Sequence, residues 1–256
     1  MGTVTYENGI AILQLIVFPI IFAAAVFIWK RSGWRAGGKI WRYGATLSLI
    51  RIAGSISSLL TIDHDSRDVR VAVAVCELIG MAPLILTFLG ILKQIDIEQR
   101  IPTRISGVMV ILCFIGLILG IASVSGSSGN TYHPGGLTKA AMGLFLAVFA
   151  IYNLMGMWLW LQLQGGMRRF QKKLFLALAL SSPFLLVRLV YSAISDYGHD
   201  KRFVLFGDET IYLCMNVLEE IIAMAIAMAL GMSAVMESDF QRLGPKEPAE
   251  PKGDGV

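Results

Sequence analysis

The stretch from Ser181 to Glu220 decides the fold: SSPFLLVRLVYSAIS (181–195) is followed by the polar segment DYGHDKRFVLFGDE (196–209) and then by TIYLCMNVLEE (210–220). Two apolar runs therefore carry internal charges, Arg188 in the first and the Glu219–Glu220 pair in the second. An ionised group at membrane depth is costly unless it faces protein, water or a counter-charge. We therefore expect these charged side chains to face the interior of a helical bundle.

The composition of the whole chain supports a membrane location. Of its 256 residues, 55% are hydrophobic and only 16% are charged. Apolar runs of about 20 residues can cross a hydrocarbon core of roughly 30 Å, and the chain has seven, at about 9–29, 43–62, 71–92, 105–124, 139–161, 174–194 and 210–233. We predict an all-α, multi-pass membrane protein, with a seven-helix transmembrane domain over 1–236 and a disordered cytosolic tail, rich in Pro, Gly and charge, over 237–256.

The short loops predict the orientation, because basic residues gather on the cytosolic side. The loop at 30–42 carries five basic residues and no acid, and the loop at 164–173 carries four and no acid. On the opposite side, the loop at 125–138 has no charged residue. The N-terminus is therefore predicted outside or in a lumen and the C-terminus in the cytosol, with the protein in the plasma membrane or an endomembrane.

The chain also shows an internal similarity. LIRIAGSISS (49–58) resembles LVRLVYSAIS (186–195), so that Arg51 matches Arg188. The span after each of these segments carries acid, Glu77 in the first case and the Glu219–Glu220 pair in the second. Spans 1–3 and 5–7 are thus predicted to be two copies of one three-helix unit, joined by a single connecting span as a 3+1+3 parallel repeat.

The charges inside the spans form the candidate site. Arg188 shares a helix face with Tyr191, Ser192 and Ser195 by i+3, i+4 and i+7 spacing, which predicts a polar stripe. Buried ion pairs that fix the register of the helices are one interpretation. The other is a cavity that contacts a substrate, a proton or a lipid head group, in which an acid left unpaired could carry the proton. The candidate residues for either role are Arg51, Glu77, Arg188, Asn216, Glu219 and Glu220.

Nothing in the sequence calls for a metal, another cofactor or nucleic acid. The three cysteines lie in apolar runs without metal-binding spacing, which predicts free thiols: Cys76, Cys113 and Cys214. A weaker alternative is a lumenal metal or acid–base site from the two His-Asp pairs, His64-Asp65 and His199-Asp200. The basic loops are interpreted as topology signals and contacts with anionic membrane lipids.

The segments SPFLLVRLVYSAIS (182–195), YLCMNVLEE (212–220) and LIRIAGSISSLLTI (49–62) resemble a family of fungal seven-span membrane proteins of unknown function. The likeness runs from about Asn8 to Val235. In general layout, though without a close motif match, the chain is also similar to lipid-translocating exporter-like proteins. The resemblance implies a fungal source and a polytopic membrane protein, and it brings no activity and no catalytic residue.

Two functions follow from the mid-membrane charges. The first is binding, transport or sensing of a hydrophobic or amphiphilic, lipid-like small molecule at a site lined by Arg51, Glu77, Arg188 and Glu219. The second is a membrane-embedded cyclase or isomerase of an isoprenoid-type substrate, in which Glu77 or Glu219 acts as general acid. A receptor is a weaker alternative, because the cytosolic loops are short.

Overall fold

The computed structural model describes residues 6–33, 37, 40–60, 67–125, 135–198 and 209–240, and all regular structure in these ranges is helical. The helices are α1 (Tyr6–Ser32), α3 (Trp41–Leu60), α4 (Arg67–Ile95), α5 (Thr103–Ser125), α6 (Gly136–Leu163), α7 (Arg169–Tyr197), α8 (Glu209–Tyr212), the π-helix η1 (Leu213–Val217) and α9 (Leu218–Val235). Seven of the described helical segments are long and apolar enough to cross a membrane, with α8, η1 and α9 joined in one span. The prediction of an all-α, multi-pass protein with seven spans is therefore confirmed, and the span ends agree to within about five residues.

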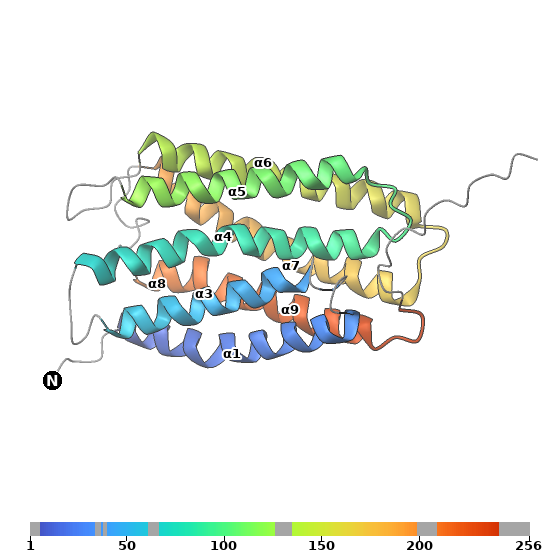
Figure 1. Ribbon diagram of the computed structural model, residues 1–256, viewed down its shortest axis with the longest axis horizontal. Coiled ribbons are helices and arrows are strands. Elements are labelled where there is room, and N and C mark those ends of the chain that lie inside the picture. Colours follow the sequence, from blue (N-terminus) through green and yellow to red (C-terminus); the bar gives the residue numbers. More distant parts are fainter. Residues whose placement is uncertain are drawn as a thin grey trace, which may run out of the picture.

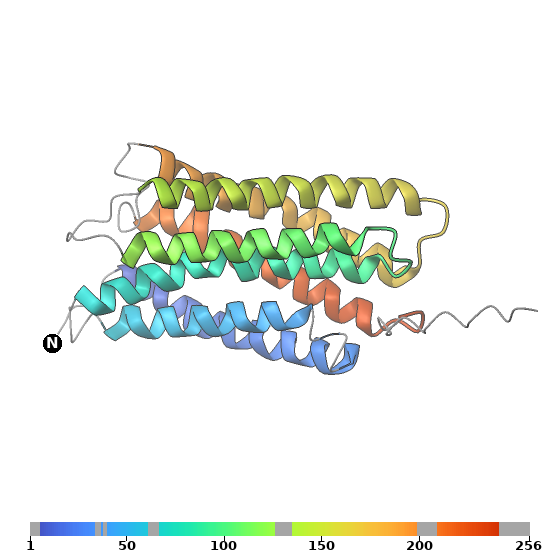
Figure 2. The same ribbon diagram turned by 45° about the horizontal axis from the view of Figure 1, so that its top comes forward.

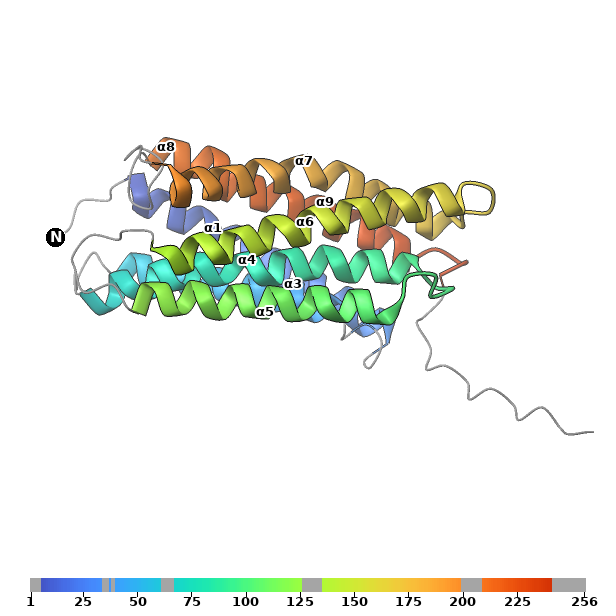
Figure 3. The same cartoon turned by 90° about the horizontal axis from the view of Figure 1, so that it is seen from above.

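The spans form a closed bundle around α4 (Figure 1). Neighbouring helices follow one another as α1, α3, α4, α5, α6, α7 and α9, and α9 packs back against α1. Because α4 also contacts α6 and α7, it lies inside this ring. Figure 2 shows α5 and α6 on one side of α4 and α1 and α3 on the other, and Figure 3 shows α7 and α9 together.

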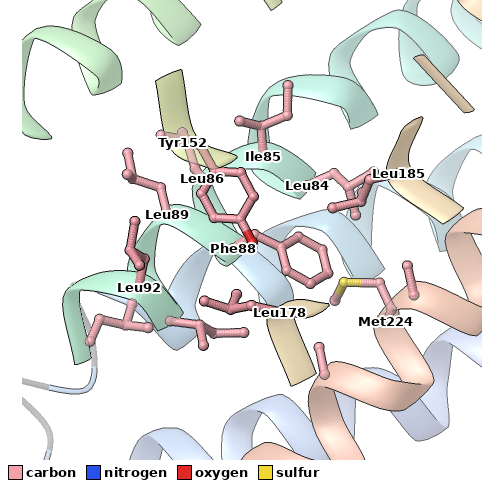
Figure 4. Packing of buried hydrophobic residues seen from close by; sticks show 14 of the residues in the cluster. Leu84, Ile85, Leu86, Phe88, Leu89, Leu92, Tyr152, Leu178, Leu185 and Met224 are labelled. Atoms are coloured by element: carbon pink, nitrogen blue, oxygen red, sulfur yellow. The ribbon is translucent and has the colours of Figure 1, made fainter. Parts of the chain in front are cut away.

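The sequence of α4 explains its central place. Residues 80–92 are all buried, so this stretch is covered by protein on every side. A helix that is apolar all round suits such a position. Figure 4 shows Phe88 of α4 among Tyr152 of α6, Leu178 of α7 and Met224 of α9.

A glycine of α9 makes room for a bulky side chain of α3. A Cβ atom added to Gly231 of α9 would lie 2.4 Å from Cη2 of Trp41. Trp41 is the first residue of α3, and its side chain is completely buried. Small residues at such crossings let helix backbones approach each other within a membrane. The bulky indole therefore depends on the absence of a side chain at Gly231.

The chain beyond α9 begins with contacts to the bundle. Lys173 of α7 donates a 2.6 Å hydrogen bond to Ser233 Oγ and forms an ion pair with Glu237. Phe240 packs edge-on against Phe170, with ring centroids 5.6 Å apart. The first residues of the predicted tail thus lie against α7, whereas 241–256 fall outside the described residues.

Candidate functional site: a charged cluster beside a cavity

Four helices each contribute one charged side chain to a buried cluster. The residues are Arg51 of α3, Glu77 of α4, Arg188 of α7 and Glu220 of α9, with exposed side-chain fractions of 2%, 12%, 2% and 1%. Two arginines and two glutamates have no net formal charge. In such a balanced cluster each ionised group has a counter-charge, which offsets part of the free-energy cost of burying it within the membrane.

Glu220 is shared by both arginines. Arg51 binds it through two parallel hydrogen bonds, from Nε to Oε1 at 2.7 Å and from Nη2 to Oε2 at 2.6 Å. Arg188 donates to the same Oε2 through Nη1, which also donates to the backbone oxygen of Asn216 at 3.1 Å. Such forked pairing of a guanidinium with a carboxylate combines strength with a fixed geometry. Glu220 therefore holds α3, α7 and α9 together.

Glu77 completes the cluster from α4. Its Oε1 lies 2.6 Å from Arg51 Nη1 and accepts a hydrogen bond from the hydroxyl of Tyr212. Its Oε2 accepts a hydrogen bond from Asn216 Nδ2 at 3.2 Å. Both carboxylate oxygens of Glu77 are thus occupied, and the cluster links α3 and α4 to the last span.

A wide helical turn sets the direction of the side chains in the last span. Tyr212, Asn216 and Glu220 are spaced four residues apart, which exceeds the 3.6 residues of one α-helical turn. The π-helix Leu213–Val217 begins directly after Tyr212 and includes Asn216, and its i to i+5 bonding widens the turn. The three polar side chains consequently stay on one face, toward Glu77 and the arginines. Short π-helical segments within α-helices are frequent at functional sites.

Gly80 of α4 makes room for the guanidinium of Arg51. A Cβ atom added at Gly80 would lie 2.8 Å from Nη2 and 3.1 Å from Cζ of Arg51. Gly80 lies three residues after Glu77, on the same side of the helix. One turn of α4 therefore supplies both the counter-charge and the space for Arg51.

A cavity of about 70 Å³ opens beside this cluster, between α4, α5, α6, α7 and η1. It lies in the half of the bundle nearer to the start of α1, since its residues come from the first half of α4 and α6 and the last part of α5 and α7. Its lining residues are Glu77, Met81, Gly116, Gly120, Thr138, Ala141, Met142, Phe145, Arg188, Tyr191, Ser192, Ser195, Asp196 and Asn216.

The two sides of the cavity differ in chemistry. The polar side is the stripe on α7 from Arg188 to Asp196, joined at its deep end by Glu77 and Asn216. The opposite side, on α5 and α6, is mainly small and apolar, with Gly120 and Phe145 among its residues, and it includes the hydroxyl side chain of Thr138. Such a cavity can accept a molecule that is polar along one side and apolar along the other.

The sequence-derived candidates do not all lie together. Arg51, Glu77, Arg188, Asn216 and Glu220 meet in the cluster, but Glu219 does not take the place expected for it beside them. Glu219 forms no ion pair with a described residue, and its Oε2 has no hydrogen-bond partner among them. The acid that α9 contributes is Glu220, and Glu219 does not line the cavity.

Two residues of the site, Tyr212 and Asp196, were not among the candidates predicted from the sequence. Tyr212 lies four residues before Asn216 on the same helix face, so its spacing is a signal that could have identified it. Asp196 was assigned to the polar loop, yet it is 7% exposed and lines the cavity. Its position four residues after Ser192 continues the polar stripe of α7.

The described residues contain no group of three or more potential metal-binding side chains. The three cysteines are free: Cys113 is buried, Cys76 half-buried and Cys214 exposed. The His64-Asp65 and His199-Asp200 pairs lie outside the described residues.

Comparisons with known proteins identify the family of the chain. No protein of curated function and no solved structure matches the chain. Residues 4–237 match the family described as a domain of unknown function, DUF7702. That match covers the whole seven-helix bundle, including the charged cluster and the cavity. The chain is therefore a member of the DUF7702 family.

Proposed function

We propose that this protein binds an amphiphilic, lipid-like small molecule in the cavity between α4, α5, α6 and α7, as a transporter, exporter or sensor. The observation that carries the proposal is the two-sided lining, polar along α7 and apolar along α5 and α6. Ligand sites are mainly apolar cavities with a few placed polar groups that fix orientation. The balanced Arg–Glu cluster supplies such groups at the deep end.

The size of the cavity indicates which part of a ligand it takes. A cavity needs about 10–15 Å³ to hold one water molecule. A cavity of about 70 Å³ therefore has room for a few groups of the size of a water molecule. That is room for a polar head group and the first carbons of a chain. The remainder of an amphiphile would extend from the cavity along the apolar helix surfaces.

The contacts of the glutamates favour binding over acid catalysis. An isoprenoid cyclase or isomerase needs a protonated carboxyl that can release its proton to the substrate. Glu77 and Glu220 both accept from arginine donors and have no free oxygen. Glu219 does not reach the cavity. Neither of the two acids named for the enzyme hypothesis, Glu77 and Glu219, is therefore placed to release a proton to a molecule in the cavity.

The proposed 3+1+3 repeat gives the cavity a counterpart in the first half of the chain. Arg51 pairs with Glu77 as Arg188 pairs with Glu220, so each half contains its own Arg–Glu pair. Beside Arg51, Ser55 donates a 3.0 Å hydrogen bond to Gln14 of α1. The matching place near Arg188 is the cavity. We infer that one half is closed by α1 while the other is open to a ligand.

We also infer that the N-terminus is outside or lumenal, which places the cavity in the outer half of the membrane. Basic residues gather at the bundle end where α1 ends, for example Arg31, Lys93, Arg168 and Lys172, and such residues mark the cytosolic side. The resemblance noted from the sequence supports a fungal source, and we propose the plasma membrane or an endomembrane as the location.

Filling the cavity tests the proposal. A Cβ atom at Gly120 would meet nothing within 4 Å, so Gly120→Leu should place a side chain into the cavity while the bundle stays folded. We expect a single-chain alcohol with a photoactivatable diazirine to label peptides of α6 and α7 in the wild type. The labelling should fall by at least about 10-fold in Gly120→Leu, as measured by mass spectrometry of the digested protein.

Gly107→Leu is the matched control. Gly107 belongs to the same helix, is exposed, and also has nothing within 4 Å of an added Cβ, but it does not line the cavity. It should leave the labelling unchanged. Equal labelling of α6 and α7 in both variants would contradict binding in the cavity.

A further inference from the structure

Asp196 is a buried acid whose role the charged cluster does not explain. It lies next to the last residue of α7, eight residues beyond Arg188 and so about 12 Å further along the helix. It is only 7% exposed, and it lines the cavity at the end away from the cluster. The cavity therefore has an acid near its outer end and a balanced cluster at its deep end.

The carboxylate of Asp196 has no direct partner in the described part of the chain. No hydrogen bond or ion pair to it occurs there, in contrast to Glu77 and Glu220. Lys139 of α6 is the described cation that acts on Asp196 electrostatically. Its Nζ, however, lies over the ring of Tyr197, 5.9 Å from the centroid, and forms no ion pair with the acid.

A buried carboxylate without a direct counter-charge is costly, and a cation that reaches it recovers part of that cost. Because the two arginines are already matched by two glutamates, they leave no positive charge for Asp196. The hydroxyls of Ser192 and Ser195 line the same cavity wall and can accept further hydrogen bonds.

We infer that Asp196 binds the protonated amine of a single-chain amphiphile, so that the ligand class of the cavity is an alkylamine-type molecule. This inference rests on the proposed function and specifies its ligand. The ammonium group would donate to Asp196 and to the nearby serine hydroxyls, and the first carbons would pack against Phe145, Ala141 and Gly120.

Other head groups fit the cavity less well. A carboxylate or phosphate would meet the negative charge of Asp196, and the charge of both arginines is already balanced by Glu77 and Glu220. Only Arg188 Nε keeps a donor without a partner among the described residues. A metal ion would need more ligands, and the described residues hold no group of three. A neutral alcohol would gain a hydrogen bond but no charge pairing.

Three probes with the same 12-carbon chain separate these cases: dodecylamine, dodecanol and dodecanoate. Binding is measured on the full chain in phosphatidylcholine nanodiscs, with the signal of empty nanodiscs subtracted. The wild type should bind dodecylamine at least about 10-fold more tightly than dodecanol and dodecanoate most weakly. Asp196→Asn should reduce the affinity for dodecylamine to about that for dodecanol, and it should change the affinity for the uncharged dodecanol much less.

Two further variants fix the interpretation. Glu209→Gln removes an exposed acid at the same end of the bundle, outside the cavity, and should behave as the wild type. Asp196→Glu should recover part of the preference for the amine, which a purely structural role of Asp196 would not predict.

The outcomes distinguish the two proposals. If dodecanol binds and Gly120→Leu abolishes its binding, but dodecylamine shows no preference, the role of Asp196 is refuted and the cavity remains a ligand site. Unchanged amine preference in Asp196→Asn also refutes that role. If none of the three probes binds the wild type above empty nanodiscs, both the amine inference and the proposed function are wrong.

Discussion

Replacing Glu220 with glutamine is expected to cost about 3–5 kcal/mol of folding free energy, because it leaves buried charge without a partner. Glu220 accepts hydrogen bonds from both Arg51 and Arg188. A neutral amide keeps the shape of the side chain but removes the counter-charge of both guanidinium groups. Of the two arginines, only Arg51 would still form an ion pair with an acid, Glu77.

Thermal unfolding of the detergent-solubilised protein, followed by size-exclusion chromatography, measures this effect. Glu219→Gln is the matched control, since it makes the same chemical change one residue earlier, at a side chain without an ion pair among the described residues. We expect its stability to stay within about 1 kcal/mol of the wild type. If the two glutamine variants lost the same stability, Glu220 would not be the shared partner of the arginines.

The second large effect is expected from Gly80→Leu. A Cβ atom at this position already lies 2.8 Å from Nη2 of Arg51, so a leucine must displace the guanidinium from Glu77 and Glu220. We expect a loss of about 3 kcal/mol or more, since overpacking and a broken buried ion pair act together. The melting temperature in detergent reports it.

A graded series separates this mechanism from general helix effects. Gly80→Ala adds only the Cβ atom, and the neighbouring guanidinium is the flexible end of a long side chain, so its loss should be smaller than that of leucine. Gly107→Leu introduces the same side chain at an exposed position of α5 with no neighbour within 4 Å. A melting temperature of Gly80→Leu equal to that of Gly107→Leu would mean that Arg51 does not occupy the space beside Gly80.

The spans were predictable from the sequence because apolar length alone decides them. A run of about 20 apolar residues has few alternatives to a transmembrane helix, and all seven predicted runs correspond to helices of that kind. Charges within such runs also indicate an inward face, which is why Arg51, Glu77 and Arg188 were found.

The choice between Glu219 and Glu220 could not be made from helical periodicity. Both residues lie within one turn of Asn216, at i+3 and i+4, and a regular α-helix favours neither. The π-helix Leu213–Val217 changes the phase of the last span, and the backbone oxygen of Asn216 within it accepts a hydrogen bond from Arg188, a residue of another helix.

Asp196 and Gly80 illustrate two other limits of sequence reasoning. Asp196 follows the apolar run directly, so composition assigns it to the loop, whereas α7 continues to Tyr197. Gly80 matters only because the side chain of Arg51 from another helix fills the space beside it. Such space between helices is a property of packing and leaves no mark in the local sequence.

The central claim is that the cavity beside the charged cluster holds an amphiphilic molecule, and untargeted mass spectrometry tests it most directly. Lipids and metabolites are extracted from the purified wild type, Gly120→Leu and Gly107→Leu, and from cells with and without the protein. The account predicts a co-purifying amphiphile in the wild type and Gly107→Leu that is absent from Gly120→Leu. The same molecules in the same amounts in all three preparations would contradict it.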